Sequence, residues 1–95
     1  MKATIAERSL IVEVSDSSLK YDQHDKASLF AAAGIADYWN INLIDRRLEI
    51  RRRPVADATQ PFGFAYADVT LHGPNDVVSP LAAPTAQIRV ADLLP

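Results

Sequence analysis

The chain has 95 residues and a formal net charge of −2, with 48% hydrophobic and 23% charged residues. This length suits one small domain over residues 1–95, with the composition of an ordinary globular protein. The chain has no cysteine, which excludes a disulfide framework, a thiolate metal site and a cysteine nucleophile. The slightly negative net charge does not favour a polyanion, such as a nucleic acid, that is bound through overall positive charge. The sequence has neither a signal-like segment nor an apolar segment of membrane-spanning length, so we expect a cytoplasmic protein.

The first half of the sequence predicts a strand, a helix and a second strand. The β-branched run at residues 10–14 predicts a largely buried strand. Residues 22–33 predict a helix, with Asp22 as its N-cap and Gly34 as the residue that ends it. Residues 36–43 predict the next strand. A strand–helix–strand start indicates a right-handed crossover and α/β layering.

The second half predicts a hairpin and a strand-rich tail. Residues 44–47 predict a tight turn with Asp45 as a turn residue, and residues 48–51 predict a half-exposed strand after it. Pro80 and Pro84 predict irregular structure near the C-terminus. The other expected elements are a loop, a strand, a short strand and a helical turn, at residues 54–61, 62–71, 87–90 and 91–94. The expected fold class is α/β (α+β), with an antiparallel extension.

Glu13 is a carboxylate inside the most hydrophobic run of the chain. A carboxylate is rarely fully buried without a partner or a metal. If the strand simply alternates, Glu13 faces solvent while Val12 and Val14 face inward. Ile11 would then share the face of Glu13, which would not be purely polar. The spacing leaves both interpretations open, a solvated carboxylate and a functional one.

Lys26 falls on one stripe of the predicted helix with Phe30 and Ala33, so it extends an apolar face toward the helix N-terminus. It could be a snorkelling lysine or an exposed partner of Asp22, and taken alone the spacing favours these interpretations. Alternatively, it points at Glu13, because the helix follows the strand and packs back on the sheet.

Arginines gather at residues 46–47 and 51–53. Short charge runs of this kind usually only solvate a face, which is the favoured interpretation. The functional alternative is contact between Arg51, Arg52 and Arg53 and the phosphate backbone of a nucleic acid.

Three segments together resemble the C-terminal half of the Uma-two family. They are LIVEVSDSSLKYDQHDK, LFAAAGIADYWNINLIDRRLEIRR and SPLAAPTAQIRVADLLP, at residues 10–26, 29–52 and 79–95. That family consists of restriction-endonuclease-like proteins of bacteria in the PD-(D/E)XK nuclease superfamily. The likeness runs over nearly the whole chain from residue 10, and Phe30 stands where the family usually has tyrosine.

The resemblance implies a site for Mg²⁺-dependent hydrolysis of DNA phosphodiester bonds. Glu13 matches the second acidic residue of the nuclease site, a metal ligand. Lys26 matches the catalytic lysine, moved to the helix, while Ser15 occupies the usual lysine position of the E-x-K motif. Asp22 matches an aspartate of the family four residues before the lysine. In this chemistry carboxylates hold the metal, the metal activates a water, and the lysine stabilises charge on the phosphate.

The sequence departs from the family before Glu13. Only twelve residues precede Glu13, Glu7 is the single acid among them, and no Pro-Asp pair occurs there. We therefore expect a truncated domain that lacks the N-terminal half, has an incomplete catalytic set and shows weak or no activity alone. Lost strands would expose a sheet edge, so we expect a homo-oligomer or a missing partner segment. The alternative function is a non-catalytic interaction or oligomerisation module derived from the nuclease fold.

Overall fold

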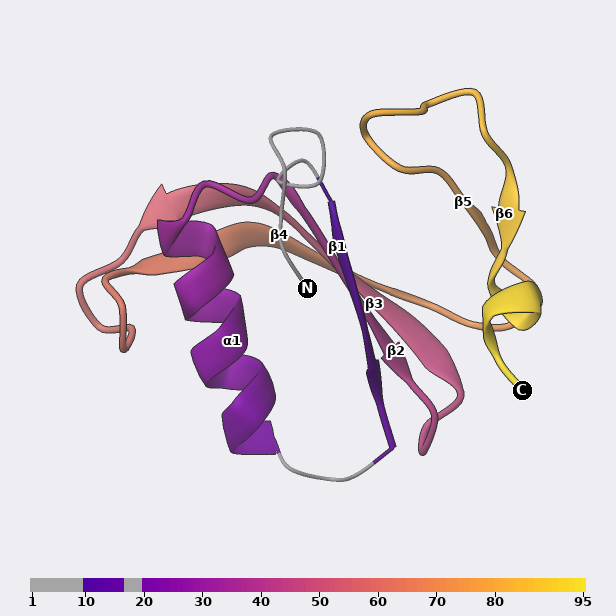
Figure 1. The fold of residues 1–95 in the computed structure, drawn as a ribbon, viewed down its shortest axis with the longest axis horizontal. Helices are drawn as coiled ribbons and strands as arrows, with labels where there is room; N and C mark the ends of the chain where they lie inside the picture. Colours follow the sequence, from indigo (N-terminus) through magenta and orange to yellow (C-terminus); the bar gives the residue numbers. More distant parts are fainter. Residues whose placement is uncertain (1–9, 17–19) are drawn as a thin grey trace.

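The computed structural model describes residues 10–16 and 20–95, with backbone only for residues 20–24. A four-stranded sheet has the order β1-β2-β3-β4 (Figure 1). β1 runs parallel to β2, and the other neighbouring pairs are antiparallel. The strands are β1 Ile11–Ser15, β2 Asp37–Asn42, β3 Arg47–Ala56 and β4 Phe64–His72. A sheet of mixed direction with one helix confirms the expected mixed α/β class.

The helix α1 (Lys20–Ala32) connects β1 to β2 and packs across one face of the sheet, against β3 and β4 (Figure 1). Gly34 ends it with φ of +77°, as the sequence predicts. The amide of Ile35 donates to the Phe30 carbonyl and that of Gly34 donates to the Ala31 carbonyl, each at 3.0 Å. These two bonds satisfy carbonyls that the helix end leaves open.

Each face of the sheet has its own apolar cluster. On the helix side Ala31, Tyr38 and Tyr66 are buried together, and Phe30 packs against them. On the opposite face the buried residues are Trp39, Ile41, Leu48, Ile50, Val78, Val90 and Leu94. The last three of these belong to the C-terminal tail, whose elements are β5 Val77–Val78, β6 Ile88–Arg89 and η2 Val90–Leu93. The tail therefore covers the face that α1 leaves open.

Several boundaries differ from the sequence predictions. α1 begins at Lys20, so the backbone of Asp22 lies inside the helix and its assignment as N-cap is wrong. β3 continues over residues 54–56, which the sequence predicted as a loop. β2 pairs with β3 only as far as Arg52, so Pro54 lies where β3 has β4 alone as a neighbour. A strand tolerates a proline at such an edge because no second neighbour needs its missing N–H.

β1 is half-exposed rather than largely buried. It pairs with β2 alone among the described strands, so it forms an edge of the sheet. Val12 and Val14 are 47% and 63% exposed, respectively. The interpretation that placed these two valines inward and Glu13 outward is therefore wrong. No helix in the described ranges is long and apolar enough to cross a membrane.

Candidate functional site

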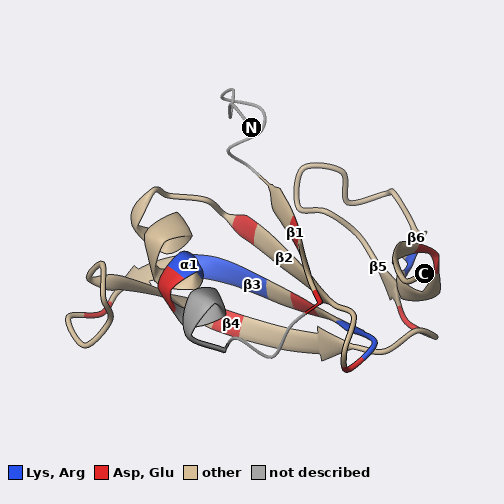
Figure 2. Cartoon of the chain, turned by 60° about the horizontal axis from the view of Figure 1, so that its bottom comes forward, with Lys and Arg blue, Asp and Glu red and all other residues tan. Residues whose placement is uncertain are grey.

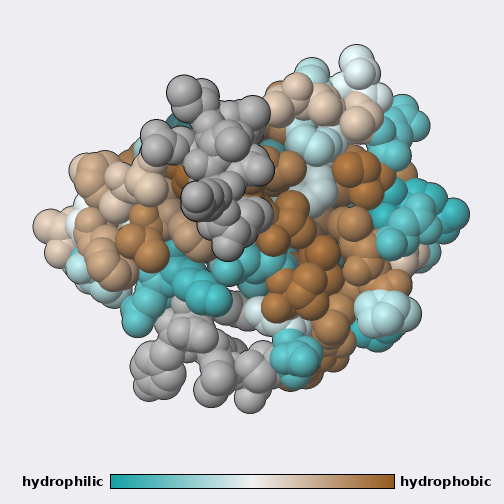
Figure 3. All heavy atoms as spheres, in the orientation of Figure 1, coloured by the Kyte–Doolittle hydropathy of each residue, from teal (hydrophilic) through white to brown (hydrophobic). Residues whose placement is uncertain are grey.

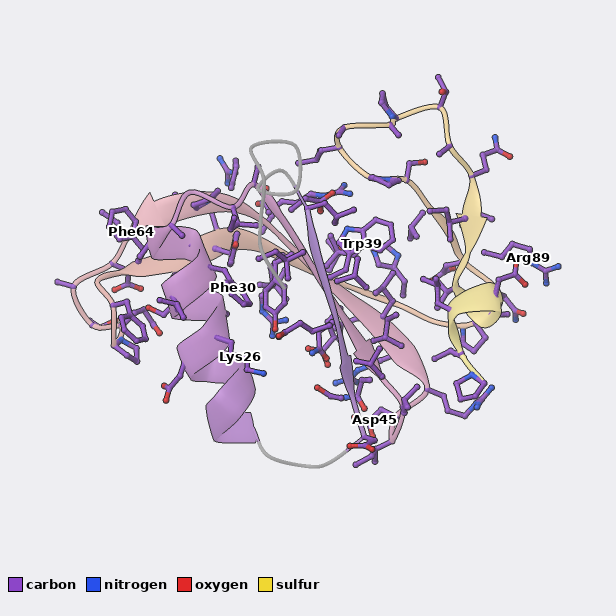
Figure 4. All side chains as sticks on the ribbon, viewed as in Figure 1. Lys26, Phe30, Trp39, Asp45, Phe64 and Arg89 are labelled. Atoms are coloured by element: carbon purple, nitrogen blue, oxygen red, sulfur yellow. The ribbon has the colours of Figure 1, made fainter. Side chains whose placement is uncertain are left out.

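The structure brings Glu13 of β1 and Lys26 of α1 together. The Nζ atom of Lys26 lies 3.5 Å from Oε2 of Glu13, across thirteen positions of sequence. The Glu13 side chain is 28% exposed and that of Lys26 is 44% exposed, so both reach solvent. Figure 4 shows Lys26 and Phe30 projecting from the side of α1 that faces β1. The pair is thus open to a ligand while it is held by two different elements.

Tyr38 fixes the second oxygen of the Glu13 carboxylate. Its hydroxyl donates to Oε1 of Glu13 at 3.1 Å. The ring is buried, with Phe30 edge-on at 5.0 Å between centroids and the Arg51 guanidinium 5.7 Å from the ring centre. Burial and the neighbouring negative charge of Glu13 raise the pKa of Tyr38 far above its ordinary value. Tyr38 therefore keeps its proton at neutral pH and remains a donor to Glu13.

A row of polar side chains continues from Glu13 across the sheet. The strand register places Glu13 beside Asn40 of β2, and Asn40 beside Glu49 of β3. Alternation puts all three on the helix side. Asn40 is 1% exposed, and its Oδ1 atom has no hydrogen-bond partner among the described residues. Asn40 and Glu49 could not be recognised from the sequence as neighbours of Glu13, because only the pairing of three strands brings them together.

Glu49 is buried and accepts hydrogen bonds from three side chains. Arg51 donates to its Oε1 at 3.2 Å, while Arg47 and Asn42 donate to its Oε2 at 3.4 Å each. Two guanidinium groups thus neutralise this carboxylate, which makes it a structural anchor of the polar row.

Ser15 and Asp22 were the supporting residues expected from the family resemblance. Ser15 ends β1 on the same side as Glu13, and its Oγ atom accepts a hydrogen bond from Asn40 Nδ2 at 3.0 Å. The Ser15 carbonyl also accepts from the Leu43 amide at 2.9 Å, which ties β1 to the end of β2. The side chain of Asp22 lies outside the described residues.

The three arginines at residues 51–53 do not share one surface. Arg51 lies over Tyr38 on the helix side, whereas Arg52 binds Asp37 on the opposite face at 2.9 Å. Arg53 has φ of +61° and forms an exposed pair with Asp68 at 2.9 Å. Figure 2 accordingly shows basic and acidic segments interleaved along the sheet. Each arginine already has a carboxylate partner, and contact with a phosphate backbone remains a prediction.

The described residues do not fit a Mg²⁺ ion by themselves. Within the described ranges no group of three or more His, Cys, Asp or Glu side chains could hold a metal. Glu13 offers one carboxylate, whose oxygens already contact Tyr38 and Lys26. Mg²⁺ takes six oxygen ligands, several of them water, and is usually held by one or two carboxylates together with phosphate oxygens. Glu13 as a metal ligand therefore remains a prediction.

The chain matches the model of a known protein family. The model of the Uma2 family, described as "Putative restriction endonuclease", matches residues 6–91. Most of the chain is covered, including both Glu13 and Lys26. No curated protein matches the chain.

Proposed function

Because this chain belongs to the Uma2 family, we propose that its Glu13–Lys26 pair is the nuclease site of the family and acts on phosphodiester bonds of DNA. One observation carries the proposal: Lys26 Nζ lies 3.5 Å from Glu13 Oε2, although a strand and a helix supply the two groups. Both side chains of the pair are partly exposed, and an exposed ion pair contributes little to the stability of the fold. The exposure of this pair supports a role in binding.

The chain's own groups would act on the phosphate in distinct ways. The Lys26 ammonium is a half-exposed cation that can bind a non-bridging phosphate oxygen and stabilise charge that develops there. Tyr38 keeps Glu13 oriented toward the same space, since its hydroxyl stays protonated and donates to Oε1. The full proposal, Mg²⁺-dependent cleavage, requires oxygen ligands in addition to Glu13.

Plasmid nicking in Mg²⁺ or Mn²⁺ tests the site, with Glu13→Gln and Lys26→Ala as variants. Arg89→Ala is the matched control, because it also removes one positive charge and Arg89 lies on the C-terminal tail, away from α1 (Figure 4). We expect both site variants to lose at least about a hundredfold in rate, a typical effect of removing one catalytic group. The control should match the wild type. Equal cleavage by all four proteins would overturn the site assignment.

A second candidate, an interaction module, rests on the edge strand. β1 has one strand neighbour among the described strands, and its valines Val12 and Val14 are each exposed over about half of their surface or more. Figure 3 shows apolar residues gathered along and beside β1 on this face. Exposed edges of this kind pair with other strands. Light scattering across a concentration series, with Val14→Lys as the variant, would show a mass that grows in the wild type alone; a constant monomer mass would refute this candidate.

A further inference from the structure

A cavity of about 330 Å³ lies between α1, β3, β4 and the loop of residues 57–63. This volume is at the lower end of the range for small-molecule sites. Its walls combine small apolar side chains with a few polar ones, as such sites usually do. The apolar set is Ala27, Ala65 and Val69, and the polar set includes Arg51, Asp57 and Gln60.

Arg51 brings its positively charged guanidinium group to the wall of this cavity. Its Nη2 atom donates to Glu49 at 3.2 Å, and its guanidinium lies over the Tyr38 ring. Its Nη1 atom is buried and has no partner among the described residues. The Arg51 side chain as a whole is 17% exposed, so it meets the cavity through its accessible atoms, and an acceptor placed against this cation would be stabilised.

Asp57 brings a fixed acceptor. One of its carboxylate oxygens accepts from the amide and the hydroxyl of Thr59, at 3.0 and 2.6 Å. These bonds hold the pKa of Asp57 below its ordinary value, so the group is ionised at neutral pH. The loop itself is closed by backbone bonds, from Asp57 N to the Gly63 carbonyl at 2.9 Å and from Gln60 N to the Asp57 carbonyl at 3.1 Å. The acceptor is therefore pre-positioned.

The chemistry of the cavity fits a nucleobase better than a phosphate. A carboxylate on the wall disfavours an anion, whereas apolar walls suit a flat ring. A base edge carries both acceptors for Arg51 and N–H donors for Asp57. Guanine fits best, because its O6 and N7 atoms suit an arginine and its N1–H and N2–H groups suit a carboxylate.

The cavity is also connected to the candidate site. Arg51 lines the cavity and contacts Tyr38, and the Tyr38 hydroxyl donates to Glu13. We propose that the cavity binds one unpaired base, preferentially guanine, of the DNA strand held at the Glu13–Lys26 pair. The claim that the base belongs to a bound DNA strand rests on the proposed function. The claim that the cavity binds a base rests on the cavity alone. A base that leaves the stack is bound in this way by enzymes that act on nucleic acids.

Free guanosine tests the cavity without any DNA strand. Saturation-transfer NMR should detect guanosine bound to the wild type, and Val69→Trp should weaken binding by at least about tenfold because the indole fills the cavity. Leu71→Trp is the matched control: Leu71 is 56% exposed, much like Val69 at 52%, and is absent from the cavity lining. Asp57→Asn should weaken guanosine binding about tenfold, by the loss of one charged acceptor. Unchanged binding in Val69→Trp, or none in the folded wild type, would overturn the proposal.

Oligonucleotides separate the cavity from the phosphodiester site. Fluorescence anisotropy is measured on a single-stranded oligo-dT that carries one central guanine, and on the same strand with an abasic position. Lys26→Ala should weaken both strands equally, while Val69→Trp should remove only the preference for guanine. Strand binding without a guanine preference overturns the base-binding proposal and leaves the proposed function intact. Guanosine binding without strand binding refutes the proposed function instead, and with it the claim that the base belongs to a bound strand.

Discussion

Asp37→Ala should strongly lower the free energy of unfolding, because Asp37 joins three segments from a fully buried position. Its carboxylate accepts from Trp39 Nε1 at 2.8 Å, from Arg52 Nε at 2.9 Å and from the Leu81 amide at 2.9 Å. It is 0% exposed. Arg52 also donates to the Ser79 carbonyl at 2.7 Å, so the two residues together fasten the C-terminal tail to the sheet.

The expected cost follows from what the alanine would leave behind. Removing one partner of a buried ion pair destabilises a protein by about 3–5 kcal/mol, since the other charge stays without compensation. The lower end applies here, because the remaining Arg52 side chain is 29% exposed and water partly compensates its charge. The Trp39 and Leu81 N–H groups would lose their acceptor as well, at about 1–3 kcal/mol for each one that stays buried. A domain of this size has a total stability of about 5–14 kcal/mol. The loss is therefore a large fraction of the total, and corresponds to a melting temperature lower by at least about 12 °C.

Urea denaturation followed by tryptophan fluorescence measures this loss, since Trp39 contacts Asp37 directly. Asp68→Ala is the matched control, because it breaks an Arg–Asp pair that has the same 2.9 Å distance but is 70% and 51% exposed. That pair should contribute less than about 1 kcal/mol. Similar losses in the two variants would refute the reasoning that burial, and not distance, sets the contribution.

Three further predictions concern the helix side of the sheet. Tyr38→Phe removes one of the two donors to Glu13. It should cost about 1 kcal/mol of unfolding free energy, measured by urea denaturation, and should weaken DNA binding, measured by anisotropy. Unchanged binding would argue against the orienting role of Tyr38. Gly34→Ala should cost about 1–2 kcal/mol in a thermal melt, all of it backbone strain at φ of +77°, since a Cβ there meets no atom within 4 Å. The pKa values of Tyr38 and Tyr66 are raised by burial above the ordinary 10.0. Below pH 10 both tyrosines are protonated in the folded and in the unfolded chain, so their contribution to stability is fully present. Above pH 10 the unfolded chain ionises both while the folded chain does not, and the unfolding free energy should fall by up to about 2.7 kcal/mol per pH unit. A flat profile in alkaline urea titrations would contradict this.

Local chemistry made parts of the fold predictable. The β-branched run before Ser15, the glycine at residue 34 and the turn at Asp45 each act within a few residues, and each lies where the sequence placed it. The extension of β3 through Pro54 could not be predicted in this way. It depends on where β2 stops pairing, and that is a property of the whole sheet.

The site was predictable only in part, for the same reason. Spacing placed Lys26 on the inward stripe of a helix, but only the path of α1 over the sheet decides that it meets Glu13. The row through Asn40 and Glu49 depends on register, which no single segment contains. Strand alternation alone places Arg51 and Arg52 on opposite faces of the sheet, which argues against the single patch of three arginines considered from the sequence.

Both candidate functions, the nuclease site and the interaction module, depend on β1. Glu13 lies on a strand whose described neighbour is β2, with Asn40 beside it in register. A strand added to the free edge of β1 would place its own side chains at the same level on the other side of Glu13, about 5 Å away between strands. A carboxylate there would lie next to Glu13 and add the oxygen ligands that Mg²⁺ requires. Addition of a strand to β1 would then both cover the edge and complete the metal site. Val14→Lys should therefore reduce self-association and any nicking together, while Lys26→Ala should reduce nicking alone.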